Sequence, residues 1–149
     1  MIDGVVIKSL DIIPADKGKG EILHAFHSLR DPEIDPKEVY FSSITKSSFR
    51  AWKLHTKMTV NLLAIHGSVN LVLIDKRKDS STLDEINEFI LSQNPYFRIK
   101  IPPGIWFGFQ GVGRENNILC NFADFHHDKN EVRNCEYGEL KYKFKEIVV

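Results

Sequence analysis

The chain has 149 residues, and its 20 Lys and Arg residues balance its 20 Asp and Glu residues, so the formal net charge is zero. Hydrophobic residues make up 42% and charged residues 27%, which is ordinary for a globular protein and excludes extended disorder. A neutral chain has no overall field to attract nucleic acid or an anionic membrane, so we expect neither as a partner. The length predicts one domain, residues 1–149.

The cysteine content and the N-terminal residues predict a cytoplasmic protein. Only Cys120 and Cys135 are present, too few for a disulfide scaffold, and Cys120 lies in an apolar run that predicts a buried, inert thiol. Residues 1–4 lack the basic and apolar segments of a secretion signal. No apolar run approaches the roughly 20 residues needed to span a bilayer, so no membrane association is expected.

Short apolar segments separated by turn residues predict a mainly β structure. The predicted strands fall at 5–13, 38–43, 60–65, 69–74 and 97–101. The clearest unit is 59–75, in which two apolar runs flank Gly67, a residue that can take a positive φ in a tight turn. We therefore expect a hairpin there.

One segment, 82–91, has two interpretations. Leu83, Ile86, Phe89 and Ile90 fall at helical spacing, and Glu85 follows Thr82 by three residues as in a capping box. A strand fits the same residues equally well, so the pattern leaves helix and strand open.

Turn residues mark the predicted loops. Glycines and charges favour a loop at 15–20, and two prolines favour another at 30–37. The segment 101–109 combines two prolines, two glycines and three aromatic residues, which predicts a tight turn leading into a strand that lines a pocket. The glycines of 111–113 indicate a hairpin turn.

His55 is the strongest candidate for chemistry, since imidazole exchanges protons near neutral pH. Taken alone, it is more typical of a hydrogen-bonded histidine in a pocket wall, and its neighbours are what favour a chemical role. Its neighbours Arg50, Lys53 and Lys57 are suited to bind phosphate, and Trp52 is suited to stack on a base or sugar, although the same residues also fit a solvated strand face.

Metal binding is disfavoured. His24 and His27 have the spacing of a shared helix face, but no third ligand is evident between residues 20 and 35. His126, His127 and Asp128 are adjacent, and neighbouring side chains on a strand point to opposite faces. We expect no metal and no cofactor.

Several short motifs, taken in order, resemble the dTDP-4-dehydrorhamnose 3,5-epimerase family of cupins. They cover about residues 15 to 125 and consist of Lys17-Gly18, Leu54-His55, Gly67-Ser68-Val69, Asp75-Lys76-Arg77, Ser81-Thr82, Ile101-Pro102-Pro103-Gly104 and Gly108-Phe109. The stretch 38–41 leading to His55 is also similar to the cupin sugar 3,4-ketoisomerases.

The resemblance implies an all-β cupin jelly roll, a double-stranded β-helix, in a homodimer, with 82–91 mostly strand. It makes His55 the base that removes a proton beside a C4 ketone, without metal or cofactor. The implied substrate is a nucleotide-linked sugar, dTDP-type. The candidate substrate-binding residues are Lys17, Arg50, Trp52, Lys53, Asn61, Arg77, Phe107 and Phe125.

Four of these positions depart from the family pattern. The family's arginine falls on Trp52, its lysine on Asn61, the histidine of its proline-glycine turn on Phe107 and its acid tyrosine on Phe125. The aspartate that orients the base belongs to a region that this shorter chain lacks. An inversion needs an acid opposite the base, which Phe125 cannot supply. The tyrosines that remain to take that part are Tyr40, Tyr96, Tyr137 and Tyr142.

The leading hypothesis is an epimerase or isomerase of a nucleotide-linked 4-keto-6-deoxy sugar in surface polysaccharide synthesis. Two alternatives stay open: a sugar 3,4-ketoisomerase, and a catalytically silent cupin that binds a nucleotide sugar.

Overall fold

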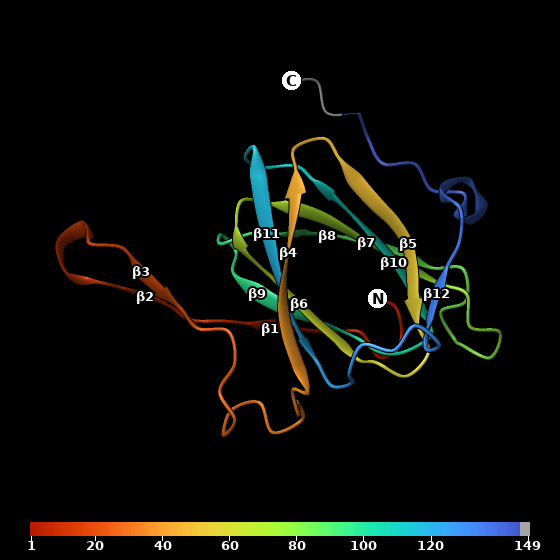
Figure 1. Cartoon of the computed structure of the whole chain (residues 1–149), viewed down its shortest axis with the longest axis horizontal. Coiled ribbons are helices and arrows are strands. Elements are labelled where there is room, and N and C mark those ends of the chain that lie inside the picture. The colour runs from red at the N-terminus through yellow and green to blue at the C-terminus, as the bar shows by residue number, and fades with distance from the viewer. Residues whose placement is uncertain (147–149) are drawn as a thin grey trace.

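The computed structural model describes residues 1–146, and its strands form two antiparallel five-stranded sheets that face each other (Figure 1). The first sheet has the order β1 (Val6–Ser9), β9 (Phe97–Ile101), β6 (Val60–His66), β11 (Asn116–Ala123) and β4 (Glu38–Thr45). The second has the order β12 (Val132–Asn134), β5 (Phe49–His55), β10 (Ile105–Gly111), β7 (Val69–Asp75) and β8 (Ile86–Leu91). This arrangement is a jelly roll and confirms the expected fold class.

The turn at Gly67 corrects the predicted hairpin. β6 and β7 exist as expected, but β6 pairs with β9 and β11 while β7 pairs with β10 and β8, so the turn crosses from one sheet to the other. The turn before β11, at 111–113, crosses between the sheets in the same way. Alternating apolar runs around a glycine do not distinguish a turn within a sheet from one between sheets.

The structure confirms the strand that the resemblance implied within 82–91 and corrects the single strand predicted at 5–13. The segment 82–91 is not helical: β8 begins at Ile86 and pairs with β7 along its whole length, and Thr82 donates a hydrogen bond to Asp75 at 2.8 Å instead of capping a helix. The segment 5–13 divides, because β1 ends at Ser9 and β2 (Ile12–Pro14) pairs with β3 (Glu21–Leu23).

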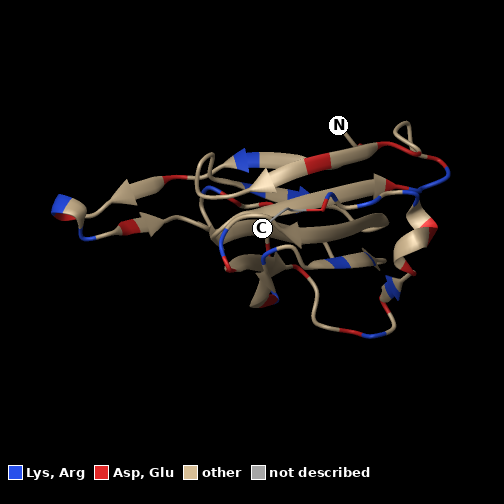
Figure 2. Ribbon diagram, turned by 90° about the horizontal axis from the view of Figure 1, so that it is seen from above, with Lys and Arg blue, Asp and Glu red and all other residues tan. Residues whose placement is uncertain are grey.

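β2 and β3 form an arm that projects from the sheets, with the short 3-10 helix η1 (Asp16–Gly18) at its tip (Figure 1). The predicted loop at 15–20 is this tip. Basic and acidic positions alternate over the ribbon and no region carries one sign alone (Figure 2). Within residues 1–146, none of the helices has the length and apolar character needed to cross a membrane.

The core lies between the sheets, where β7 is buried at every position. Cys120 is 3% exposed, on the other face of β11 from the core residue Leu119, and burial raises the pKa of its thiol to about 11, in agreement with the inert thiol predicted. The segment 135–146, which includes the 3-10 helix η2 (Tyr137–Leu140), covers the outer face of the second sheet and packs Phe144 against the Trp52 ring.

Candidate active site

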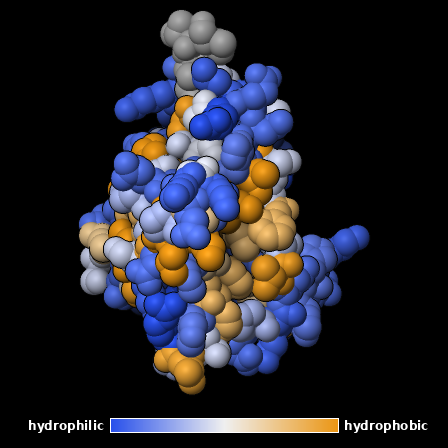
Figure 3. Space-filling model, turned by 90° about the vertical axis from the view of Figure 1, so that its left-hand side faces the viewer, coloured by the Kyte–Doolittle hydropathy of each residue, from blue (hydrophilic) through white to orange (hydrophobic). Residues whose placement is uncertain are grey.

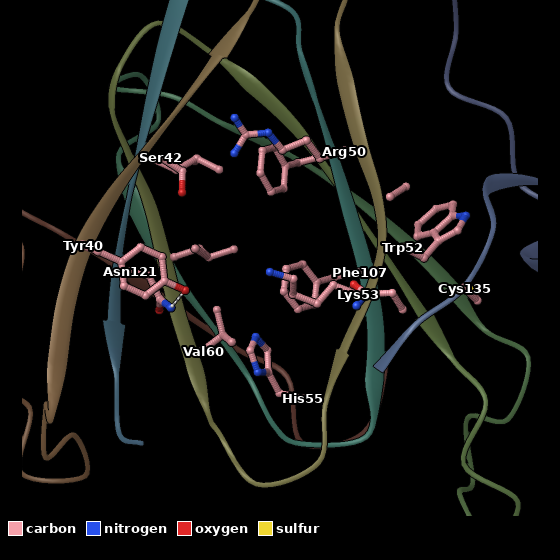
Figure 4. A pocket seen from close by; sticks show the side chains of 15 residues that line it. Tyr40, Ser42, Arg50, Trp52, Lys53, His55, Val60, Phe107, Asn121 and Cys135 are labelled. Carbon is pink, nitrogen blue, oxygen red and sulfur yellow. Dashed lines mark hydrogen bonds between the residues drawn. The ribbon is translucent and has the colours of Figure 1, made fainter. Parts of the chain in front are cut away.

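A cavity of about 400 Å³ lies between the two sheets, with β4, β6 and β11 on one side and β5 and β10 on the other (Figure 4). Its lining is mixed. Val60, Leu62 and Leu119 are apolar, whereas Tyr40, Arg50, Lys53, His55 and Asn121 provide hydrogen-bonding groups and charge. Such a concave, largely apolar space with a few convergent polar groups is typical of a small-molecule site.

His55, at the end of β5, faces this cavity and is paired with Glu131 behind it. The ring nitrogen Nδ1 contacts Glu131 Oε1, and both side chains are buried, at 6% and 0% exposed. An ionised carboxylate only accepts hydrogen bonds, so Nδ1 carries the proton and Nε2 is left with a lone pair. The pair therefore presents the imidazole as a base.

Backbone contacts keep Glu131 ionised. Its Oε2 accepts hydrogen bonds from the backbone N–H groups of Thr56, Lys57 and Met58 at 3.1–3.3 Å. Burial alone would raise the pKa of Glu131, but the hydrogen bonds from His55 and from these backbone groups outweigh burial and lower it. The carboxylate is thus fixed in position and negatively charged at neutral pH.

The cavity wall formed by β5 owes its charge to one extra residue. Between Phe107 and Phe109 of β10 the partner positions on β5 move from Lys53 to Arg50, so three steps of β5 face two of β10. Side chains alternate along a strand, and the extra residue shifts that alternation by one. As a result Arg50, Lys53 and His55 all point inward.

Tyr40 and Asn121 occupy the opposite wall. Tyr40 lies on β4 and Asn121 on the neighbouring β11, and Figure 4 shows both projecting into the cavity across from His55. Burial raises the pKa of Tyr40, and the nearby charges of Glu38 and Glu131 raise it further against the lowering effect of Asn121. Tyr40 therefore remains a protonated phenol at neutral pH.

Phe107 lines the cavity as the resemblance implies, whereas Trp52 lines it with the indole directed away from the interior (Figure 4). The rings of Phe107 and His55 stack with centroids 5.8 Å apart. The Trp52 indole is 2% exposed and points away from the cavity, with Nε1 donating to the Tyr137 carbonyl at 3.1 Å (Figure 4). The C-terminal segment covers the indole, so this geometry does not support stacking of Trp52 on a ligand in the cavity.

The other predicted binding residues lie apart from the cavity. Asn61 is buried on the opposite face of β6 from Val60 and Leu62, with its amide donating to Phe122. Arg77 is ion-paired with Asp75 at 2.8 Å, and Lys17 lies at the tip of the arm. The Lys57 ammonium lies over the Phe125 ring, 5.7 Å from the ring centroid.

Glu131 is the residue that sequence reasoning missed. We expected this chain to lack an acidic partner for the base, and the structure corrects that expectation. Glu131 lies 76 positions after His55, in a charged stretch typical of a solvated loop. The feature that would have located it is the strand that follows. β12 pairs with β5 and places Val132 beside His55, so Glu131, one residue earlier, lies next to the imidazole.

Residues 1–146 contain no group of three or more His, Cys, Asp or Glu side chains arranged to hold a metal ion. His126 and His127 lie in a loop, so the strand alternation invoked for them does not apply.

The fold and the His55–Glu131 pair define a jelly-roll protein with a buried histidine–carboxylate pair that faces the cavity between its sheets. No family model matches the sequence. A probable low-salt glycan biosynthesis epimerase, Agl13 of Haloferax volcanii, is 30% identical over 123 residues, covering 81% of this chain and 78% of that one. The chain belongs to the cupin family of sugar-nucleotide epimerases and isomerases typified by dTDP-4-dehydrorhamnose 3,5-epimerase.

Solved structures agree with this assignment. A dTDP sugar isomerase from Desulfovibrio desulfuricans superposes with a TM-score of 0.89 and 27% identity, covering 95% of this chain and 91% of that one. The epimerase RmlC from Legionella pneumophila, solved with dTDP-4-keto-L-rhamnose, has a TM-score of 0.81 and 19% identity over 93% of this chain and 76% of its own. The second likeness concerns the fold alone.

Proposed function

We propose that this protein epimerises or isomerises a nucleotide-linked 4-keto-6-deoxy sugar for surface polysaccharide synthesis. The observation that carries the proposal is the placement of two proton-transfer groups on facing walls of one cavity. His55, backed by Glu131, lies on β5, and Tyr40 lies on β4 of the other sheet. Membership in the epimerase family supports the same conclusion.

The reaction begins when Nε2 of His55 removes the proton from the carbon beside the C4 ketone. The electron pair of the broken C–H bond moves into the ring and the carbonyl, giving an enolate. Tyr40 then donates its phenol proton to that carbon from the opposite face, the carbonyl re-forms, and the configuration is inverted. Solvent reprotonates the tyrosinate and removes the proton from His55, so the cycle is balanced.

The two alternatives predict different arrangements. A 3,4-ketoisomerase returns the proton to the sugar from the same face, so it has no need for an acid on the facing wall. A silent binding cupin has no need for a buried carboxylate behind its histidine. Tyr40 on the facing wall and Glu131 behind His55 therefore favour inversion.

The inward cations support a nucleotide diphosphate as the rest of the substrate. Arg50 and Lys53 share the inner face of β5 with His55. Arg50 keeps part of its guanidinium free, since one nitrogen donates to the Ser43 carbonyl at 3.1 Å and the side chain is exposed. A guanidinium and an ammonium on one wall suit phosphate oxygens, and dTDP is the nucleotide we propose.

A homodimer is part of the proposal. The arm exposes Ile13 and Ile22 at 46% and 57%, and the edge strand β4 exposes Val39 and Phe41 at 49% and 64%. Figure 3, viewed from the side on which the arm projects, shows apolar surface among hydrophilic side chains. A second copy of the chain would cover this surface. Lys17, at the tip of the arm, would then lie near that second copy. We place the protein in the cytoplasm, where Cys120 and Cys135 stay reduced.

The test is NMR of dTDP-4-keto-6-deoxyglucose incubated with the protein in heavy water. We expect loss of proton signal at C3 or C5 and the appearance of an inverted sugar. Wash-out with a product whose ketone has moved would support the ketoisomerase instead. Binding of the nucleotide sugar with no exchange at either carbon would support the silent cupin.

A further inference from the structure

The amide of Asn121 has only one possible orientation in this structure. Its Oδ1 accepts a hydrogen bond from the backbone N–H of Asn61 at 2.9 Å. A backbone N–H only donates, so the atom facing it must be the carbonyl oxygen. The NH₂ group is then directed at Tyr40, where Nδ2 donates to the phenol oxygen at 2.8 Å (Figure 4).

This orientation determines where the proton of Tyr40 can go. The phenol oxygen accepts from Asn121, so its own O–H cannot point back along that bond. Among the described residues, the Tyr40 O–H has no hydrogen-bond acceptor of its own. The proton is therefore free to point into the cavity, toward the side occupied by His55.

Burial makes the orientation hard to reverse. Asn121 is 2% exposed, so no bulk water is available to pair with a rotated amide. Rotation would place NH₂ against the N–H of Asn61 and leave a buried donor without an acceptor, which costs free energy comparable to a lost hydrogen bond. The strand pairing of β6 with β11 holds the Asn61 N–H in place.

We infer that Asn121 is a positioning residue that directs the phenol proton of Tyr40 into the cavity for delivery to the substrate. The inference rests on the proposed function, because it explains how Tyr40 is oriented to donate its proton in that reaction. A merely structural Asn121 would stabilise the pairing of β6 with β11 and affect both halves of the reaction alike. The two roles therefore differ in their effect on deprotonation and reprotonation.

The decisive variant is Asn121→Asp. A carboxylate still accepts from the N–H of Asn61 but cannot donate to Tyr40, so the phenol turns its proton toward the carboxylate and away from the cavity. We expect inversion to fall about 10- to 100-fold. Wash-out of substrate protons in heavy water, which needs only His55, should stay within about threefold of wild type, and KM should change little.

A double variant tests whether Asn121 acts through Tyr40. In a Tyr40→Phe background the phenol proton is absent, so adding Asn121→Asp should lower inversion no further. The control is Cys120→Ala, which alters the neighbouring position on β11 on the face turned away from the cavity and should leave the ratio of wash-out to inversion unchanged. If Asn121→Asp does not fold, Asn121→Ser, whose hydroxyl is too short to reach Tyr40, takes its place.

Equal losses of wash-out and inversion in Asn121→Asp, or additive losses in the double variant, would overturn the inference and make Asn121 structural. Absence of wash-out in the wild-type protein would overturn the proposed function first, and this result is distinguishable because it does not depend on any variant. Wash-out that survives while inversion falls supports both.

Discussion

Two buried carboxylates in this protein, Glu131 and Asp31, have similar surroundings and different consequences. Their side chains are 0% and 4% exposed, and both are ion-paired. Burial alone would raise each pKa, and in each case hydrogen bonds from the partner reverse the shift and lower it. The difference lies in the partners: Glu131 faces the imidazole of His55, whereas Asp31 faces the guanidinium of Arg98 at 2.7 Å and the ammonium of Lys8.

The partner of a buried carboxylate decides what that carboxylate does. A guanidinium and an ammonium group do not exchange protons near neutral pH, so Asp31 can only stabilise the folded protein. It accepts from the backbone N–H of His27 at 2.8 Å and thereby fixes the loop between the arm and β4. Imidazole changes its protonation near neutral pH, so Glu131 acts on a group that can remove a proton.

The largest effect should come from removing the titratable partner. His55→Asn deletes the base and is expected to lower turnover about 10²- to 10⁴-fold, the usual range for loss of a general base. The folded state should persist, since asparagine can still pair with Glu131. Steady-state assays with circular dichroism as the folding control would measure both, and undiminished turnover would remove His55 from the mechanism.

The structural carboxylate should behave in the opposite way. Asp31→Asn removes the nearer anion of Arg98, which is 2% exposed and then keeps only Glu33 at 3.7 Å, and should lower the free energy of unfolding by about 3–5 kcal/mol. Turnover per folded molecule should not change, because Asp31 does not line the cavity. Denaturant titration and active-site-normalised assays separate the two effects, and a loss of turnover in the folded fraction would break the contrast.

Glu131→Gln replaces the carboxylate behind His55 by a neutral amide of the same shape. Glutamine keeps an oxygen for the backbone N–H groups behind it but directs an amide at Nδ1 of His55, which favours the tautomer whose Nε2 carries the proton. Turnover should fall about 10- to 100-fold while binding of dTDP stays the same. Calorimetry of dTDP binding beside the assay measures this, and an equal loss of binding would point to a general disturbance of the cavity.

The smallest effect concerns pH. The folded-state pKa values of Asp31 and Glu131 are lowered, so their contribution to stability is complete above the ordinary carboxyl values of 3.8 and 4.5 and is lost as pH falls below them. The free energy of unfolding should decline in acid by up to about 1.4 kcal/mol per pH unit for each proton taken up. In Asp31→Asn the decline should be shallower, and an unchanged slope would contradict the proposed ion pairing.

Much of the fold was predictable, because short apolar runs between turn residues mark strands. The positions of β4, β6, β7 and β9 follow from these runs. The sheet to which each strand belongs does not follow from the sequence. The residues at Gly67 suit a turn back into the same sheet as well as a turn into the facing sheet. The helical spacing of 82–91 arose from an edge strand with one exposed face.

The lining of the cavity was predictable where it comes from one short segment. Arg50, Lys53 and His55 follow one another along β5 and were all identified. Glu131 and Asn121 were missed because they come to β5 and β4 only through long-range strand pairing. The outward turn of Trp52 depends on Tyr137 and Phe144, at the far end of the chain.

The extra residue in β5 between Arg50 and Lys53 bears on how such a protein can diverge. A sequence change that removed the bulge without changing the chain length would restore plain alternation over the three steps between Arg50 and Lys53. Arg50 would then turn to the outside, while His55 and its pairing with β12 would stay in register. Straightening the strand would thus remove one cation from the cavity without moving His55. A change at this bulge could therefore alter which phosphorylated compound the cavity accepts, while the His55–Glu131 pair stays the same.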